Sequence, residues 1–133
     1  RWPFALVHGE PLVAAAAWLP WITAIANDHG YEDIFWRQLE GHARPGDLAF
    51  ALSVSGKSPN IVSAVKWCVA HQLRTVALVG GGEGSVSQLA DTVISVPEKH
   101  YGRVEDVYMT ICHVISYAFA EGAISRADLP ARS

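Results

Sequence analysis

A continuous apolar run, a serine-rich turn and an amphipathic segment follow one another in the middle of this chain. The run, residues 48–52, is short and unbroken, which is typical of a strand buried on both faces of a parallel sheet. The turn after it contains Ser53, Ser55 and Ser58, and Pro59 stands where a helix can begin. The sequence therefore predicts a buried strand, a hydroxyl-rich turn and a helix.

The serine-rich turn, residues 53–58, is a candidate site for an anion. Unpaired backbone N–H groups and the helix dipole favour negative charge at a helix N-terminus. We therefore predict that this turn binds a phosphate group. A simpler interpretation is that Ser58 only caps the helix, although an N-cap alone does not require Ser53 and Ser55.

Strands and helices are predicted to alternate along the rest of the chain. Apolar runs predict further strands over 12–18, 74–79 and 92–96, although the alanines within 12–18 would also allow a helix. Apolar spacing predicts helices over 21–27, 31–43, 60–72, 85–90 and 104–121. This alternation predicts an α/β fold: a three-layer α/β/α sandwich with a parallel sheet, doubly wound as in flavodoxin. Ligands of such sheets bind at the carboxyl ends of the strands, where the serine-rich turn is expected.

Composition and charge limit the class of protein. The chain has 133 residues, 50% hydrophobic and 17% charged, enough for one domain over 1–124 with a polar tail over 125–133. A net charge of −3 argues against nucleic acid or an anionic membrane as a partner. The apolar run 11–25 is too short to span a membrane. Cys68 and Cys112 are expected to be free thiols in a reducing compartment.

Three other groups of polar residues are candidates for chemistry. Asn27 and Asp28 form a turn or helix end, or they bind sugar hydroxyls through mixed donors and acceptors. Glu105 and Asp106 place favourable charge near a helix N-terminus, and this structural role alone could explain them. His113 lies on an apolar helix, as a core or interface histidine or as a catalyst. It follows Glu105 by about two turns, or about 12 Å, so that long side chains could converge on one ligand or metal ion.

Several segments together resemble the sugar isomerase (SIS) domain proteins, specifically the phosphoheptose isomerase type. The segments that carry the resemblance are 26–35, 44–47, 53–61, 96–97, 103–107 and His113. The resemblance extends over about residues 21–121 and implies aldose–ketose isomerisation of a sugar phosphate through an enediol. In that family the reaction converts sedoheptulose 7-phosphate to D-glycero-D-manno-heptose 7-phosphate.

The resemblance also implies roles for individual residues. Ser53, Val54, Ser55 and Ser58 would hold the phosphate, while Asn27 and Asp28 would contact the sugar. His113 matches the catalytic or zinc-binding histidine of the family. Glu105 replaces a glutamine that touches substrate and metal, and a carboxylate there acts as a base or as a stronger zinc ligand. The implied cofactor is zinc, the implied assembly is a homotetramer with sites between subunits, and the implied location is the cytoplasm.

A second departure, besides the one at Glu105, leaves an alternative open. The first third of the family's chain, which carries its main catalytic glutamate, has no counterpart here. The sequence is expected to be a fragment, with a natural short form as the other interpretation. The alternative is a non-catalytic, phosphosugar-binding adaptor of the same fold, such as the relatives that bind a replication initiator and lack the catalytic histidine. The presence of His113 favours the enzyme. A third possibility is isomerisation of a different phosphosugar.

Overall fold

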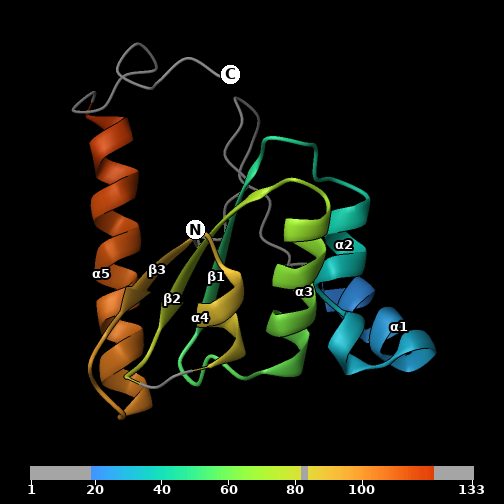
Figure 1. The fold of residues 1–133 in the computed structure, drawn as a ribbon, viewed down its shortest axis with the longest axis horizontal. Helices are drawn as coiled ribbons and strands as arrows, with labels where there is room; N and C mark the ends of the chain where they lie inside the picture. The colour runs from blue at the N-terminus through green and yellow to red at the C-terminus, as the bar shows by residue number, and fades with distance from the viewer. Residues whose placement is uncertain (1–18, 82–83, 122–133) are drawn as a thin grey trace.

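The computed structural model describes residues 19–81 and 84–121, in which three helical segments precede the first strand and strands and helices alternate after it (Figure 1). In chain order the elements are α1 (Leu19–His29), the 3-10 helix η2 (Tyr31–Asp33), α2 (Trp36–Glu40), β1 (Leu48–Ser53), α3 (Pro59–Ala70), β2 (Arg74–Val79), α4 (Ser85–Leu89), β3 (Thr92–Ser95) and α5 (Tyr101–Ala120). The three strands predicted within these residues are confirmed, as are the helices that follow the first two. The strand predicted over 12–18 lies outside the described residues.

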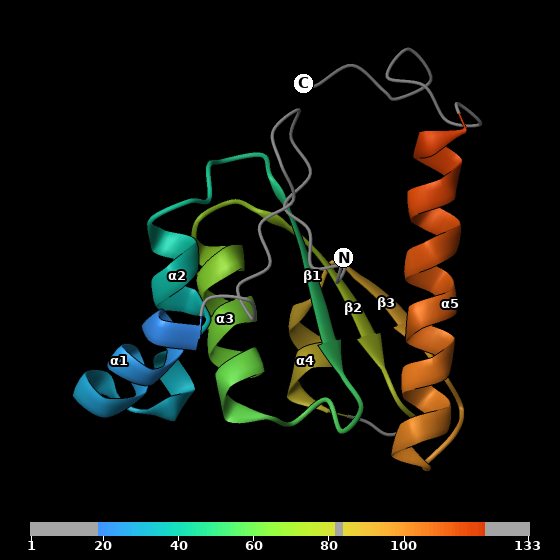
Figure 2. The same ribbon diagram turned by 180° about the vertical axis from the view of Figure 1, so that it is seen from behind.

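The described strands form a parallel sheet in the order β1-β2-β3. Alternate side chains of the central strand face opposite sides: Ala77 and Val79 face α3 and α4, and Leu78 faces α5. Figure 2 shows the same division from behind, with α5 alone on one face of the sheet. The buried core on the first face is Val65, Ala77, Val79 and Val86, and that on the second is Leu78, Val104 and Tyr108. The predicted three-layer α/β/α sandwich is confirmed.

The helix predicted over 31–43 is wrong as a single element. The structure has the 3-10 helix Tyr31–Asp33, a turn, and then the short helix Trp36–Glu40. The backbone N–H of Gln38 bonds to the carbonyl of Phe35 at 3.1 Å, while the side-chain amide of Gln38 donates to the carbonyl of Ile34. Because the side chain takes the acceptor that a regular helix gives to the backbone, the helical ladder does not run through this point.

Two predicted helix starts also differ from the structure. Helix α1 spans Leu19–His29 rather than 21–27, and α5 begins at Tyr101 rather than at residue 104. The Glu98 carboxylate accepts hydrogen bonds from the backbone N–H groups of Lys99 and His100, at 2.7 and 2.9 Å. These bonds, with the Arg103 guanidinium 3.0 Å away, hold the pKa of Glu98 down at about 2. An ionised carboxylate just before the helix favours its early start.

The loops after β1 and β2 touch through their glycines. Gly56, in the serine-rich turn, has a φ of +62°, and the backbone N–H of Val86 bonds to its carbonyl at 3.0 Å. A Cβ at Gly84 would collide with the backbone of Gly56. A second bond joins the loops, from the N–H of Gly80 to the carbonyl of Val54 at 3.0 Å. The shape of the serine-rich turn therefore depends on Gly84 in the neighbouring loop, which has no side chain.

We expect Gly84→Ala to displace the serine-rich turn, because the added methyl group has no room against Gly56. Overpacking of this kind costs roughly 1–3 kcal/mol of the free energy of unfolding. Denaturant titration measures this loss. The matched control is Gly102→Ala in α5, where a Cβ meets only the His100 ring at 3.5 Å. Alanine there leaves stability unchanged or raises it by up to about 1 kcal/mol. Equal stability of the two variants would contradict the role given to Gly84.

Candidate functional site

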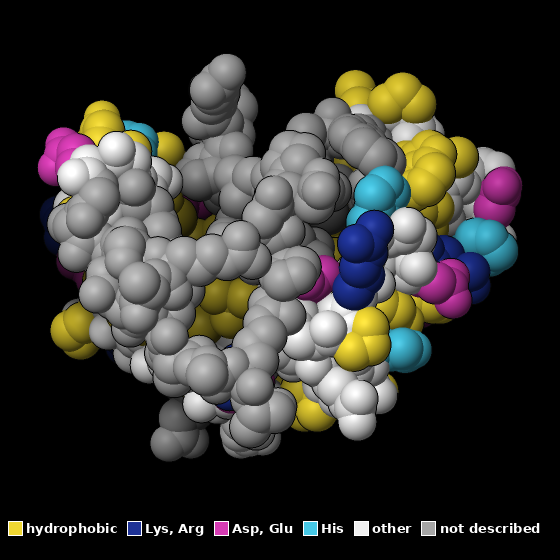
Figure 3. All heavy atoms as spheres, turned by 90° about the horizontal axis from the view of Figure 1, so that it is seen from above, with side chains coloured by type: hydrophobic (Ala, Val, Ile, Leu, Met, Phe, Trp, Pro, Cys, Tyr) yellow, Lys and Arg dark blue, Asp and Glu magenta, His cyan; other side chains and the backbone are white. Residues whose placement is uncertain are grey.

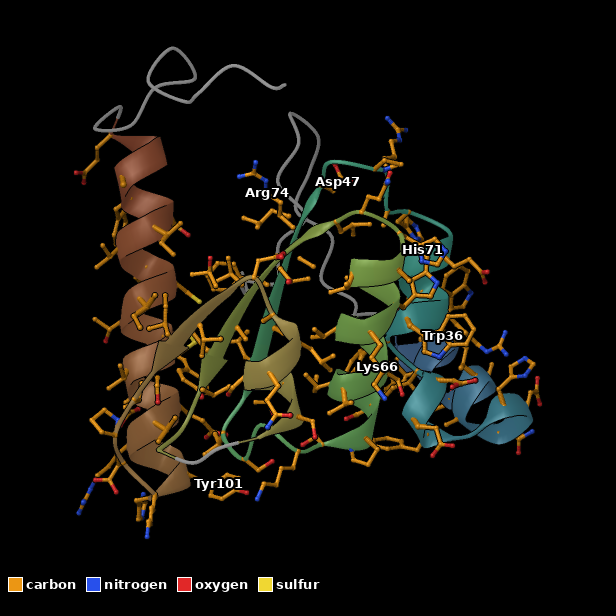
Figure 4. All side chains as sticks on the ribbon, viewed as in Figure 1. Trp36, Asp47, Lys66, His71, Arg74 and Tyr101 are labelled. Atoms are coloured by element: carbon orange, nitrogen blue, oxygen red, sulfur yellow. The ribbon has the colours of Figure 1, made fainter. Side chains whose placement is uncertain are left out.

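A pocket of about 620 Å³ lies between the serine-rich turn and the first half of α5. The strand and turn contribute Leu52, Ser53, Val54, Ser55 and Ser58; the helix contributes Tyr101, Glu105, Asp106, Tyr108, Met109 and Cys112. Figure 4 shows Tyr101 at the edge where the strands end, and Asp47 and Arg74 at the opposite edge, where β1 and β2 begin. The pocket therefore occupies the carboxyl edge of the sheet, at a size that suits a small molecule.

The serine-rich turn lines one side of this pocket. Ser53 is 6% exposed, and its hydroxyl has no hydrogen-bond partner among the described residues. The hydroxyl of Ser55 accepts a bond from the N–H of Lys57 at 3.2 Å and lies 3.5 Å from the hydroxyl of Ser58. Ser58 occupies the N-cap position of α3, before Pro59, yet its side chain makes no capping hydrogen bond. The turn therefore presents hydroxyl groups that the fold itself does not use as caps.

The predicted site residues do not all come together. The pocket unites Ser53, Val54, Ser55, Ser58 and Glu105. Its lining does not include His113, which is exposed on α5 and lies beside Tyr117, with 6.1 Å between the ring centres. At about 100° per residue, an offset of eight residues turns His113 about 80° away from Glu105. Convergence of these two side chains on one small ligand is therefore not seen in the described chain.

Asn27 and Asp28 are also outside the lining of this pocket. They stand in the last turn of α1, and both are exposed. The side-chain amide of Asn27 donates to the carboxylate of Asp28 at 2.8 Å. Their contact with a sugar stays a prediction, since nothing in the described part of the chain brings them to the pocket.

The sequence analysis missed Tyr108 as a residue of the pocket. Tyr108 is 4% exposed, and its hydroxyl has no hydrogen-bond partner among residues 19–81 and 84–121. Burial, with the nearby Glu105 carboxylate, raises the pKa of Tyr108 to about 12. A signal was present, because residues 101, 105, 108, 109 and 112 follow the spacing of one helix face. In the structure α5 packs on the sheet, and this face of the helix lies opposite the serine-rich turn across the pocket.

The two cysteines are free and buried. Burial raises the pKa of the Cys112 thiol, which lines the pocket, and raises that of Cys68 to about 12. Across residues 19–81 and 84–121, His, Cys, Asp and Glu side chains form no group of three or more that could hold a metal ion. Glu105 and His113 alone do not make a zinc site in the described chain.

Among the described residues, no helix combines the length and the apolar character needed to cross a membrane. Figure 3 shows the molecule from the end at which the strands begin. There, acidic, basic and histidine side chains are interspersed among the described residues.

The chain is similar in sequence to curated phosphoheptose isomerases, although no family model matches it. It is 43% identical over 94 residues to the phosphoheptose isomerase of Akkermansia muciniphila, covering 71% of this chain and 50% of that protein. It is 40% identical over 95 residues to the one from Mycobacterium tuberculosis, with 71% and 48% covered. It is 34% identical over 108 residues to the phosphoheptose isomerase of a Roseiflexus species, and the match covers 81% of this chain and 55% of that protein. The chain spans about half the length of the curated relatives it matches.

Solved structures agree with the sequence comparison. A phosphoheptose isomerase from Francisella tularensis superposes with a TM-score of 0.74 at 28% identity, over 78% of this chain and 59% of that one. The enzyme from Neisseria gonorrhoeae gives a TM-score of 0.74 at 28% identity, with 77% and 58% covered. The resemblance to the phosphoheptose isomerases, members of the SIS-domain proteins, is thereby confirmed in sequence and in fold.

Proposed function

We propose that this chain is part of an aldose–ketose isomerase acting on a sugar phosphate, with sedoheptulose 7-phosphate as substrate and D-glycero-D-manno-heptose 7-phosphate as product. The observation that carries the proposal is one pocket with serine hydroxyls on one side and the Glu105 carboxylate on the other. The similarity to proteins named phosphoheptose isomerase supports the choice of sugar.

The serine-rich turn is proposed to hold the phosphate. The hydroxyls of Ser53, Ser55 and Ser58, with the backbone at Val54, stand at the start of α3, where N–H groups and the helix dipole favour an anion. A phosphate fixed there binds the substrate at a point remote from its reacting carbons, and that binding energy can be used to orient them.

The reaction requires two proton transfers. In the open-chain sugar one group moves a proton between C1 and C2 through an enediol, and another moves a proton between the two oxygens. Glu105 is proposed as the carboxylate base, because it lines the pocket at the position where the family has a glutamine that touches the substrate. His113 is proposed as the second group, since histidine exchanges protons near neutral pH. As His113 is exposed outside the pocket, its action requires a site completed by residues beyond the described ones.

A homotetramer with sites between subunits would supply such residues. Beside His113 on α5, Val114 and Tyr117 are 62% and 60% exposed, and Ile115 is 38% exposed. Large apolar side chains of this kind are enriched in the core of subunit interfaces. Burial of this part of α5 against another copy would bring His113 into a closed environment.

Zinc remains a proposal that depends on further ligands. Structural and catalytic zinc sites take three or four protein ligands, and the described residues offer only Glu105 and His113 from the implied set. Bound zinc would polarise the sugar carbonyl. Metal analysis of the purified protein, before and after chelation, tests this part of the proposal separately. The cytoplasm is the proposed location, which the buried free thiols support.

The alternative is a phosphosugar-binding adaptor without catalysis. The position of His113 outside the pocket favours it, because the described lining of the pocket does not include that side chain. Such a protein would bind the sugar phosphate without exchanging its protons.

The first measurement is proton NMR in deuterium oxide with sedoheptulose 7-phosphate, with and without zinc. We expect exchange of the C1 or C2 proton with solvent, because the sugar passes a carbon-bound proton to the enzyme when the enediol forms, and a deuteron from solvent can take its place when the enediol is reprotonated. His113→Ala should abolish exchange while sugar-phosphate binding persists. The control is His71→Ala, an exposed histidine that stacks on Trp67 at the far end of α3. Unchanged exchange in His113→Ala would contradict the role of that histidine, and binding without exchange in the parent would favour the adaptor.

Phosphate binding is tested with Ser55→Ala. A lost hydrogen bond to a charged group costs about 1.5–3 kcal/mol, so the Kd for inorganic phosphate and for the sugar phosphate should both rise by roughly 10- to 100-fold. Ser63→Ala, in α3 but outside the pocket lining, serves as the control and should bind like the parent. Titration calorimetry reports both constants. Equal affinity of the parent and Ser55→Ala would remove this residue from the phosphate site.

A further inference from the structure

Tyr108 has a polar group that the fold leaves unsatisfied beside the pocket. Its side chain lines the pocket, and its ring packs in the core with Leu78 and Val104. Only 4% of the residue is exposed, yet its hydroxyl has no hydrogen-bond partner among the described residues. A buried hydroxyl without a partner is costly, and a structural role of this residue would be served equally well by phenylalanine.

The neighbours of Tyr108 indicate what would satisfy its hydroxyl. The Glu105 carboxylate lies one turn earlier on the same face of α5, close enough to raise the pKa of Tyr108. The phenol therefore keeps its proton at neutral pH and can donate a hydrogen bond, while the carboxylate can accept one. A donor and an acceptor side by side on one helix face are suited to a chain of hydroxyl and carbonyl oxygens.

We propose that Tyr108 is a substrate-binding residue, whose hydroxyl donates a hydrogen bond to an oxygen of the sugar chain next to Glu105. This inference rests on the proposed function for the nature of the ligand. It separates the pocket into two parts: the serine-rich turn binds the phosphate, and the Tyr108–Glu105 face of α5 binds the carbon chain.

Tyr108→Phe keeps the ring in the core and removes only the hydroxyl. In the ligand-free protein the variant should melt higher than the parent, by roughly 2–8 °C, because an unsatisfied buried group is lost. Its Kd for sedoheptulose 7-phosphate should rise by about 5- to 50-fold, because one oxygen of the bound sugar loses its donor. Its Kd for inorganic phosphate should not change, since the serine-rich turn is intact.

The control is Tyr31→Phe, in the 3-10 helix η2, where the residue is 66% exposed and outside the pocket lining. It should change neither the melting temperature nor either Kd. Calorimetric titration and thermal melting measure these values without any need for turnover. A parent protein that binds the sugar phosphate without catalysis would contradict the proposed isomerase activity, and this test of Tyr108 would still be valid.

Three results with the Tyr108→Phe variant would overturn this inference alone. A lower melting temperature of Tyr108→Phe would show that its hydroxyl has a structural partner. An unchanged Kd for the sugar phosphate would show that the hydroxyl does not touch the sugar. An equal loss of affinity for inorganic phosphate would place the hydroxyl on the phosphate instead. A parent protein that binds neither ligand would contradict the proposed function and this inference together.

Discussion

The close approach of two loop backbones at the carboxyl edge of the sheet fixes the rest of the site. Gly56 accepts a hydrogen bond from Val86, and Gly84 lies against it with no room for a side chain. This contact joins the loop after β1 to the loop after β2, so neither can be reshaped alone. It holds the serine-rich turn at the start of α3 in one conformation, and the pocket opposite α5 takes its shape from that turn. A ligand site held in this way loses little conformational freedom on binding.

The layered fold could be predicted from the sequence because its signals are local. A run such as residues 48–52 indicates a strand buried on both faces, and the serines after it mark the carboxyl edge of the sheet. The break between η2 and α2 could not be predicted, since it depends on the side-chain amide of Gln38 taking the carbonyl of Ile34. Apolar spacing carries no information about such competition between side chain and backbone.

The candidate site divides in the same way between local and non-local information. The serine-rich turn is one stretch of sequence, and its residues line one pocket, while their binding of phosphate stays a prediction. The expected convergence of Glu105 and His113 on one ligand depends on the directions of two side chains on a long helix. The helical repeat points these side chains in different directions. Tyr108 was not predicted as a site residue, although its spacing from Glu105 places both on one helix face. That its hydroxyl has no hydrogen-bond partner among the described residues could not be predicted, because this depends on residues far away in the chain.

The lining of the pocket contains two carboxylates, Glu105 and Asp106, and among the described residues no basic side chain. In the proposed function, a phosphate dianion would be held here by hydroxyl and amide dipoles against an unfavourable local charge. Neutral donors recognise an anion by the directions of its oxygens, whereas a lysine or arginine would attract any anion from a distance. Such a site would select its ligand by shape after contact, and its lining would do little to speed the arrival of an anion.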